Sequence, residues 1–169
     1  MAGKIYNVLV LCTGNSARSV MTEVLINTMG RGRFSAYSAG SKPTGSVHPF
    51  ALEQVQQLGY PIATLRSKSW NEFTQAEAPL MDFVITVCNN AAGEVCPVWP
   101  GHPLTTHWDI DDPAAIQGDD AQKRRGFARV FYFLKRRVQQ LVDLPLKTPD
   151  PLAMKREFDS ITSDNIGEF

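Results

Sequence analysis

The chain has 169 residues, of which 43% are hydrophobic and 20% charged, enough for one globular domain with a substantial core. Its 17 basic and 17 acidic residues cancel, which argues against a nucleic-acid or membrane-surface partner. The apolar run near the amino terminus is shorter than a signal-peptide core or a membrane span, so we expect a cytoplasmic protein.

The first half of the chain alternates between strand and helix patterns. A nearly continuous apolar run over 5–11 predicts a strand that is covered on both faces, as in a parallel sheet. From Ser19 apolar residues recur at helical spacing until Gly30, which predicts a helix directly after this strand. A second strand is expected over 34–39, and a second helix is expected from Pro49.

The second half continues this alternation less regularly. Residues 60–80 show no clean period and are expected to form an ordered loop with some helix. Runs rich in β-branched residues predict strands over 83–88 and 104–108, separated by a loop with several prolines and glycines. Together these patterns predict an α/β fold built on a parallel sheet.

The last long segment combines an apolar stripe with many basic residues. Apolar residues at helical spacing predict a helix over 127–141. Because the total charge is zero, we interpret the basic residues as a solvated helix face rather than a nucleic-acid patch. These are Lys123, Arg124, Arg125, Lys135, Arg136 and Arg137. Prolines and polar residues then dominate, so we expect one domain over 1–142 and a loosely ordered tail over 143–169.

One stretch joins a cysteine, small polar residues and an arginine between the first strand and the first helix. Five residues separate Cys12 from Arg18, enough for a tight loop whose N–H groups converge on an oxyanion held by the guanidinium. The positive end of the helix favours the anion and lowers the pKa of the thiol. This predicts a nucleophile beneath an anion held by Thr13, Gly14, Asn15, Ser16, Ala17, Arg18 and Ser19. The alternative is a cysteine that ends a buried strand and an arginine that pairs at the surface.

An acidic cluster is expected at the same edge of the sheet, because the carboxyl ends of parallel strands lie together. A carboxyl group near the loop could protonate a departing oxygen, and Asp112, before Pro113, is the first candidate. Asp109 and Asp111 compete for this role. All three could instead be turn residues or helix caps.

The three cysteines argue against a disulfide framework and for reactive thiols. The histidines are scattered and no Cys-x-x-Cys pair exists, so we predict no metal site. Cys88 ends a predicted strand and Cys96 lies in the following loop. Both could also be structural thiols without a redox partner.

Two of these motifs resemble the low-molecular-weight tyrosine phosphatase superfamily. They are the Cys-Thr-Gly-Asn-Ser-Ala-Arg-Ser sequence of 12–19 and the Asp112-Pro113 pair. The Cys-x5-Arg-Ser signature is specific when it follows a strand and opens a helix, and the resemblance spans roughly 5–142. The chain is similar to the arsenate reductase branch, with which it shares Ser38-Ala39-Gly40, Val47-His48-Pro49 and His107-Trp108.

The resemblance implies a single-domain, four-stranded parallel sheet with helices on both faces. It implies that Cys12 is the nucleophile, Arg18 the oxyanion clamp and Asp112 the general acid. Asn15 and Ser19 would hold the loop and the thiolate, and Ser38 would support Asn15.

The resemblance also implies a redox relay. Cys88 would attack the arsenylated Cys12, releasing arsenite and leaving a Cys12–Cys88 disulfide, which Cys96 would convert to Cys88–Cys96. An external thiol reductant, thioredoxin or glutaredoxin with glutathione, would reduce this last disulfide. The substrate would be arsenate or a phosphate-type oxyanion, and no bound cofactor is implied.

Two departures from the pattern keep alternatives open. Seven residues separate Cys88 from Cys96, one more than is usual in thioredoxin-coupled members, so glutaredoxin remains a candidate reductant. Ala114 follows Pro113 where phosphatases of the superfamily place an aromatic residue. The leading hypothesis is therefore an arsenate reductase. The alternatives are a tyrosine phosphatase in which Cys88 only protects Cys12 from over-oxidation, and a non-catalytic oxyanion-binding module.

Overall fold

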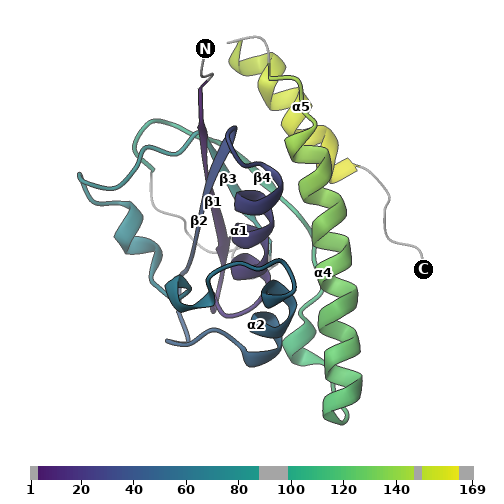
Figure 1. Ribbon diagram of the computed structural model, residues 1–169. Coiled ribbons are helices and arrows are strands. Elements are labelled where there is room, and N and C mark those ends of the chain that lie inside the picture. The colour runs from purple at the N-terminus through teal and green to yellow at the C-terminus, as the bar shows by residue number, and fades with distance from the viewer. Residues whose placement is uncertain (1–3, 88–98, 147–149, 164–169) are drawn as a thin grey trace.

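A computed structural model describes residues 4–87, 99–146 and 150–163 of the chain. At its centre lies a four-stranded sheet in the order β2-β1-β3-β4, and every neighbouring pair is parallel (Figure 1). The strands are β1 (Tyr6–Cys12), β2 (Phe34–Gly40), β3 (Phe83–Thr86) and β4 (Leu104–His107). This confirms the predicted parallel sheet and places each strand within two residues of its expected start.

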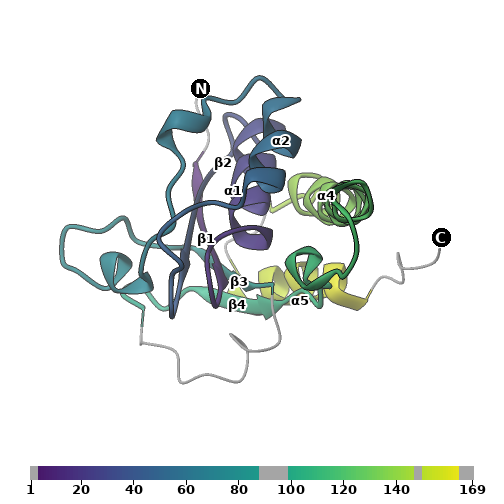
Figure 2. The same ribbon diagram turned by 90° about the horizontal axis from the view of Figure 1, so that it is seen from below.

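Among the described residues, four α-helices cover one face of the sheet, which we call the first face (Figure 2). They are α1 (Arg18–Met29), α2 (Pro49–Gln56), α4 (Asp120–Val142) and α5 (Pro151–Ser163). Successive side chains of a strand point to opposite faces of the sheet, so Val8 and Val10 join the helical core on this face while Leu9 and Leu11 point the other way. Because all four strands are parallel, their carboxyl ends lie at the same edge of the sheet.

The second face of the sheet is covered differently. Leu9 and Leu11 pack there with Phe73, Met81 and other apolar side chains. The segment that carries Phe73 folds as the 3₁₀ helix η2 (Trp70–Phe73). Elsewhere in the described residues, η1 (Ile62–Thr64) and η3 (Pro113–Ala115) are also short 3₁₀ helices. In the described part of the chain, the helix expected on this face is thus a short 3₁₀ turn.

The expected loose tail is wrong for residues 151–163, which form α5. Phe158 and Ile161 of this helix are buried in the core of the first face, and the Phe158 ring lies 4.7 Å from the Phe83 ring centroid. The prolines of this segment precede the helix or open it, because Pro151 is its first residue. The folded unit therefore continues past residue 142.

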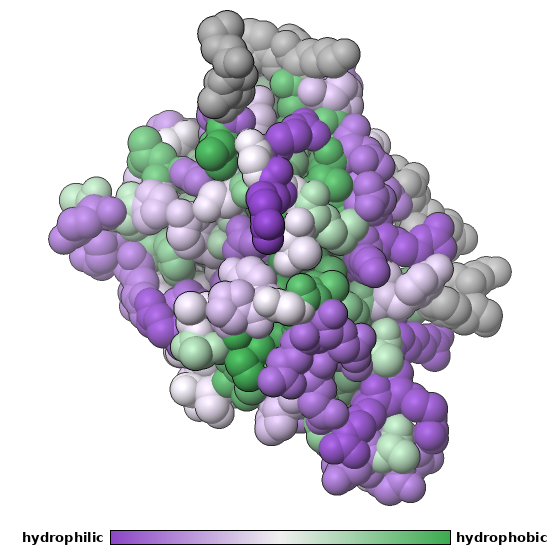
Figure 3. All heavy atoms as spheres, in the orientation of Figure 1, coloured by the Kyte–Doolittle hydropathy of each residue, from purple (hydrophilic) through white to green (hydrophobic). Residues whose placement is uncertain are grey.

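The prediction that the basic residues of α4 form a solvated face is partly wrong. Arg124 and Arg125 are exposed as expected, and polar side chains dominate the protruding end of this helix (Figure 3). Arg137 instead is buried and donates a hydrogen bond to the carbonyl oxygen of Ile161 at 3.1 Å. Its guanidinium thus joins α4 to α5. In the described ranges, no helix combines the length and apolar character needed to cross a membrane.

Candidate active site

The loop between β1 and α1 holds the predicted nucleophile at the carboxyl edge of the sheet. Cys12 is the last residue of β1, is only 4% exposed and lies opposite Gly40 of β2. A β-carbon at Gly40 would lie 2.4 Å from the carbonyl oxygen of Thr13, so only glycine allows this approach. The two strand ends therefore fix the start of the loop.

Carbonyl groups of the loop are held from outside by neighbouring segments. The carbonyl oxygen of Gly14 accepts hydrogen bonds from the Thr44 N–H and the Ser67 hydroxyl, both at 3.0 Å. That of Ser16 accepts one from the His48 N–H at 2.8 Å. The C=O and N–H of a trans peptide point in opposite directions, so the following N–H groups turn away from these partners. This leaves backbone donors for an anion on the inner side of the loop.

The amide of Asn15 organises the inside of the loop. Asn15 is fully buried and has a positive φ of 47°, which Asn tolerates better than most residues. Its Nδ2 donates to the Ser19 Oγ at 2.8 Å and to the Ser38 Oγ at 3.0 Å. The structure therefore brings Asn15, Ser19 and Ser38 together, as the resemblance implied.

Helix α1 begins directly at the end of this loop. Ala17 occupies the N-cap position, and no side chain of the described residues caps the helix there. The first N–H groups of a helix lack intrahelical partners, and the helix dipole favours negative charge at this end. The start of α1 is thus suited to bind an oxyanion.

Arg18 is held by the turn that follows β4. Its Nη1 donates to the carbonyl oxygen of Ile110 at 3.0 Å, and its Nη2 lies 3.6 Å from the Asp112 Oδ2. The Arg18 side chain is only 14% exposed. These contacts place the guanidinium at the mouth of the loop.

Asp112 has two contacts that fit two different roles. Its Oδ1 accepts a hydrogen bond from the Ala114 N–H at 3.0 Å and so caps η3, while its Oδ2 faces Arg18. The carboxyl group is 42% exposed, which leaves it open to a bound ligand. Asp109 and Asp111 are exposed as well, but in the described part of the chain Asp112 is the acidic residue within ion-pair distance of Arg18.

Comparison with known proteins identifies the family. Residues 7–157 match the family model of the low molecular weight phosphotyrosine protein phosphatases. The chain belongs to this family. It is 34% identical to an arsenate reductase of Halalkalibacterium halodurans over 79% of this chain and 92% of that protein. It is 36% identical to an arsenate reductase of Bacillus subtilis over 71% of this chain and 83% of that protein.

A solved structure described as an arsenate reductase in the phosphate binding state has the same fold. It superimposes with a TM-score of 0.65 at 28% identity, over 82% of this chain and 97% of that one. These likenesses confirm the resemblance to the low molecular weight phosphatases and their arsenate reductase branch.

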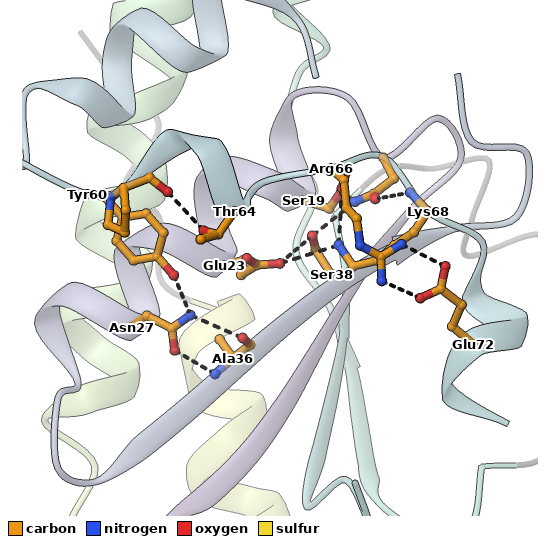
Figure 4. A network of polar contacts seen from close by, with 12 residues as sticks. Ser19, Glu23, Asn27, Ala36, Ser38, Tyr60, Thr64, Arg66, Lys68 and Glu72 are labelled. Carbon is orange, nitrogen blue, oxygen red and sulfur yellow. Dashed lines mark hydrogen bonds and ion pairs between the residues drawn. The ribbon is translucent and has the colours of Figure 1, made fainter. Parts of the chain in front are cut away.

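Two charged residues beneath the anion loop were not predicted from the sequence. Glu23 of α1 accepts a hydrogen bond from the Ser38 Oγ at 2.7 Å, and the Lys68 Nζ lies 3.9 Å from the Glu23 Oε1 (Figure 4). Glu23 follows Ser19 by four residues on the same helix face, a spacing that could have indicated it. Lys68 lies in the stretch without a clean period, so no sequence signal pointed to it.

The two other cysteines of the predicted relay, Cys88 and Cys96, lie outside the described residues. The chain that leads to them is described as far as Val87, whose N–H donates to the carbonyl oxygen of Leu11 at 2.9 Å. In the described ranges, no group of three or more metal-ligating side chains is found.

Proposed function

We propose that this protein is an arsenate reductase. The observation that carries the proposal is the loop of Cys12, with Arg18 and Asp112 at its mouth, in a chain related to arsenate reductases over most of its length. A buried thiol beneath uncapped helix N–H groups suits nucleophilic attack on a bound oxyanion. An arsenate reductase with this fold has been observed in a phosphate binding state, which supports the same anion site here.

In the first step the Cys12 thiolate attacks arsenic and an oxygen of arsenate departs as water. Arg18 would hold two of the remaining oxygens with its planar guanidinium, which a point charge cannot imitate. Asp112 would donate the proton to the departing oxygen. Thr13, Gly14, Asn15, Ser16, Ala17 and Ser19 would form the rest of the cradle.

In the second step the Cys88 thiolate attacks the sulfur of Cys12. The electron pair of the sulfur–arsenic bond passes to arsenic, so As(V) leaves as arsenite and a Cys12–Cys88 disulfide forms. Cys96 then attacks Cys88, which frees Cys12 and leaves a Cys88–Cys96 disulfide. Thioredoxin, or glutaredoxin with glutathione, would reduce this bond, and such a reductant places the enzyme in the cytoplasm.

A phosphotyrosine phosphatase is the second candidate, because the family is named for that activity. The residues after Pro113 are small and exposed, namely Ala114 and Ala115. They offer no aromatic face on which the ring of phosphotyrosine could stack. The reductase is therefore the preferred function.

One assay separates the two functions. NADPH oxidation is measured with arsenate and either the thioredoxin or the glutaredoxin system, in parallel with aryl-phosphate hydrolysis. We expect arsenate-dependent oxidation with one of the two systems. Efficient aryl-phosphate hydrolysis without any arsenate reduction would replace the reductase proposal by the phosphatase.

A Cys88→Ser variant sharpens the assay. A hydrolase does not need this thiol for turnover, so any aryl-phosphate hydrolysis should persist while arsenate reduction stops. If arsenate reduction continues in Cys88→Ser, the relay through this residue is wrong.

A further inference from the structure

Residues 66–69, which we call the strap, cross beneath the anion loop from a distant part of the chain. The Ser67 hydroxyl donates to the carbonyl oxygen of Gly14, and the Lys68 N–H donates to the Asn15 Oδ1 at 2.9 Å. The carbonyl oxygen of Lys68 accepts a hydrogen bond from the Gly40 N–H at 2.9 Å. The strap is therefore attached both to the loop and to the end of β2.

The strap fixes which way the Asn15 amide points. A backbone N–H can only donate, so the Asn15 atom that faces Lys68 must be the oxygen. The amide nitrogen must then face Ser19 and Ser38 and donate to both hydroxyls. The Ser19 oxygen accepts this bond, which leaves its own proton free to be donated into the loop.

The carboxylate of Glu23 fixes the other end of this chain of hydrogen bonds. The Ser38 hydroxyl donates to Glu23 and can therefore accept from Asn15. Each hydrogen bond of this network then has one fixed donor. Donation runs from Asn15 through Ser38 to the Glu23 carboxylate on one side, and from Asn15 to Ser19 on the other.

Lys68 also supplies the charge that faces this carboxylate. Its Nζ lies 3.9 Å from the Glu23 Oε1 and donates to the carbonyl oxygen of Arg66 at 3.1 Å. The two charged side chains are only 11% and 12% exposed. On the outer side of the strap, Arg66 forms an ion pair with Glu72 that is open to solvent (Figure 4).

Burial makes the Glu23–Lys68 pair costly for the fold. Burial raises the pKa of Glu23, an effect that the charge of Lys68 partly offsets. Burial likewise lowers the pKa of Lys68, opposed by the charge of Glu23. Both shifts disfavour the charged forms in the folded state, so we expect the pair to add little to the stability of the fold.

We propose that Glu23 and Lys68 are positioning residues, which hold the Asn15, Ser19 and Ser38 side chains in the arrangement that keeps Cys12 reactive. This inference rests on the proposed role of Cys12 as the nucleophile. Lys68 acts through both its backbone N–H and its ammonium group, and Glu23 acts through Ser38. Neither residue needs to touch the substrate.

The test measures how fast iodoacetamide alkylates Cys12 as a function of pH, with the modified peptide quantified by mass spectrometry. The variants are Lys68→Met, the double variant Glu23→Gln/Lys68→Met, and Arg66→Gln. The last removes the same charge from the same strap, at a solvent-exposed position where screening weakens its effect. The Tm of each variant is measured alongside.

For Lys68→Met we expect about tenfold slower alkylation below the thiol pKa, equivalent to an upward shift of about one unit. In the double variant alkylation should also be slower than in the wild type, although the net charge of positions 23 and 68 is zero in both. Its Tm should be unchanged or higher. Arg66→Gln should behave as the wild type.

Three results would overturn the proposal. They are a wild-type profile in Lys68→Met, a wild-type profile in the double variant, and an equal shift in Arg66→Gln. The second result would mean that the pair acts through its field alone and not by positioning. Because alkylation requires no arsenate, a failed reductase assay would leave this result standing, and the reverse holds as well.

Discussion

The two ends of the sheet are built from different kinds of interaction. At the carboxyl end, the anion loop is held by hydrogen bonds to the amide of Asn15 and to the carbonyl groups of Gly14 and Ser16. At the amino end, aromatic rings pack together, with Phe83 placed 5.6 Å from Tyr6 and 4.7 Å from Phe158 between ring centroids. The contacts that hold the anion loop are directional and polar, whereas these ring contacts are apolar.

This contrast separates function from stability. Directional bonds place donors and a thiol within tenths of an ångström, which binding of an oxyanion requires. Apolar packing is insensitive to direction and contributes in proportion to the area removed from water. We therefore expect substitutions at the carboxyl end to affect activity first, and substitutions at the amino end to affect the free energy of unfolding first.

The largest effect is expected for Cys12→Ser. A serine hydroxyl in the loop stays protonated and is a poor nucleophile, so arsenate reduction and any aryl-phosphate hydrolysis should both be lost. The side chains are similar in size, so the Tm should remain close to that of the wild type. Full turnover by this variant would contradict the assignment of the loop.

Asp112→Asn should slow the chemical step by ~10²–10⁴-fold if this residue is the general acid. Asparagine also caps helices well, so η3 and its contact with Ala114 should persist. Single-turnover rates measure the effect, and Asp109→Asn and Asp111→Asn are the controls. A large loss in either control instead would move the acid to that position.

Phe158→Ala tests the apolar end of the comparison. Removing this fully buried ring should cost about 3–5 kcal/mol of unfolding free energy, measured by denaturant titration. The value of kcat below the melting temperature should not change. Leu152→Ala on the same helix is the control, because Leu152 is 73% exposed and should change stability by at most about 0.5 kcal/mol. A lower kcat in the folded Phe158→Ala variant would mean that the two ends are coupled.

Gly40→Ala should affect both activity and stability. The added methyl group meets backbone oxygens of Thr13 and Cys12, so the loop must shift, at a cost of about 1–3 kcal/mol. Arsenate should bind more weakly, as measured by protection of Cys12 from alkylation. Gly14→Ala should be milder, because the nearest atom there is a side-chain methyl of Thr44. An arsenate affinity equal to that of the wild type would contradict the close approach of Gly40 to the Thr13 carbonyl group.

Much of the carboxyl end could be predicted from sequence, because the signal is local. The span from Cys12 to Ser19 joins a buried strand to a helix within eight residues, and each residue type has a direct physical role. Asp112 could be selected from its cluster by the resemblance, and the structure places it beside Arg18. Its role as the acid stays a prediction.

The parts that sequence did not indicate depend on contacts between distant segments. Lys68 meets Glu23 across forty-five residues, and the stretch around Lys68 has no periodicity. Helix α5 is stabilised by burial of Phe158 and by the hydrogen bond from Arg137. The prolines and polar residues around it gave no sign of a helix in the sequence. The sequence pattern predicts a solvated Arg137, whereas its guanidinium is buried and donates a hydrogen bond to Ile161 of the unexpected helix α5.

The most direct measurement is a single turnover of Cys96→Ser with arsenate and no external reductant, followed by arsenite quantification and peptide mass spectrometry. Without Cys96 the relay should stop after one cycle, with one arsenite released per chain and a Cys12–Cys88 disulfide in the protein. Arsenite released without that disulfide, or sustained turnover of Cys96→Ser once thioredoxin is added, would contradict the proposed relay from Cys12.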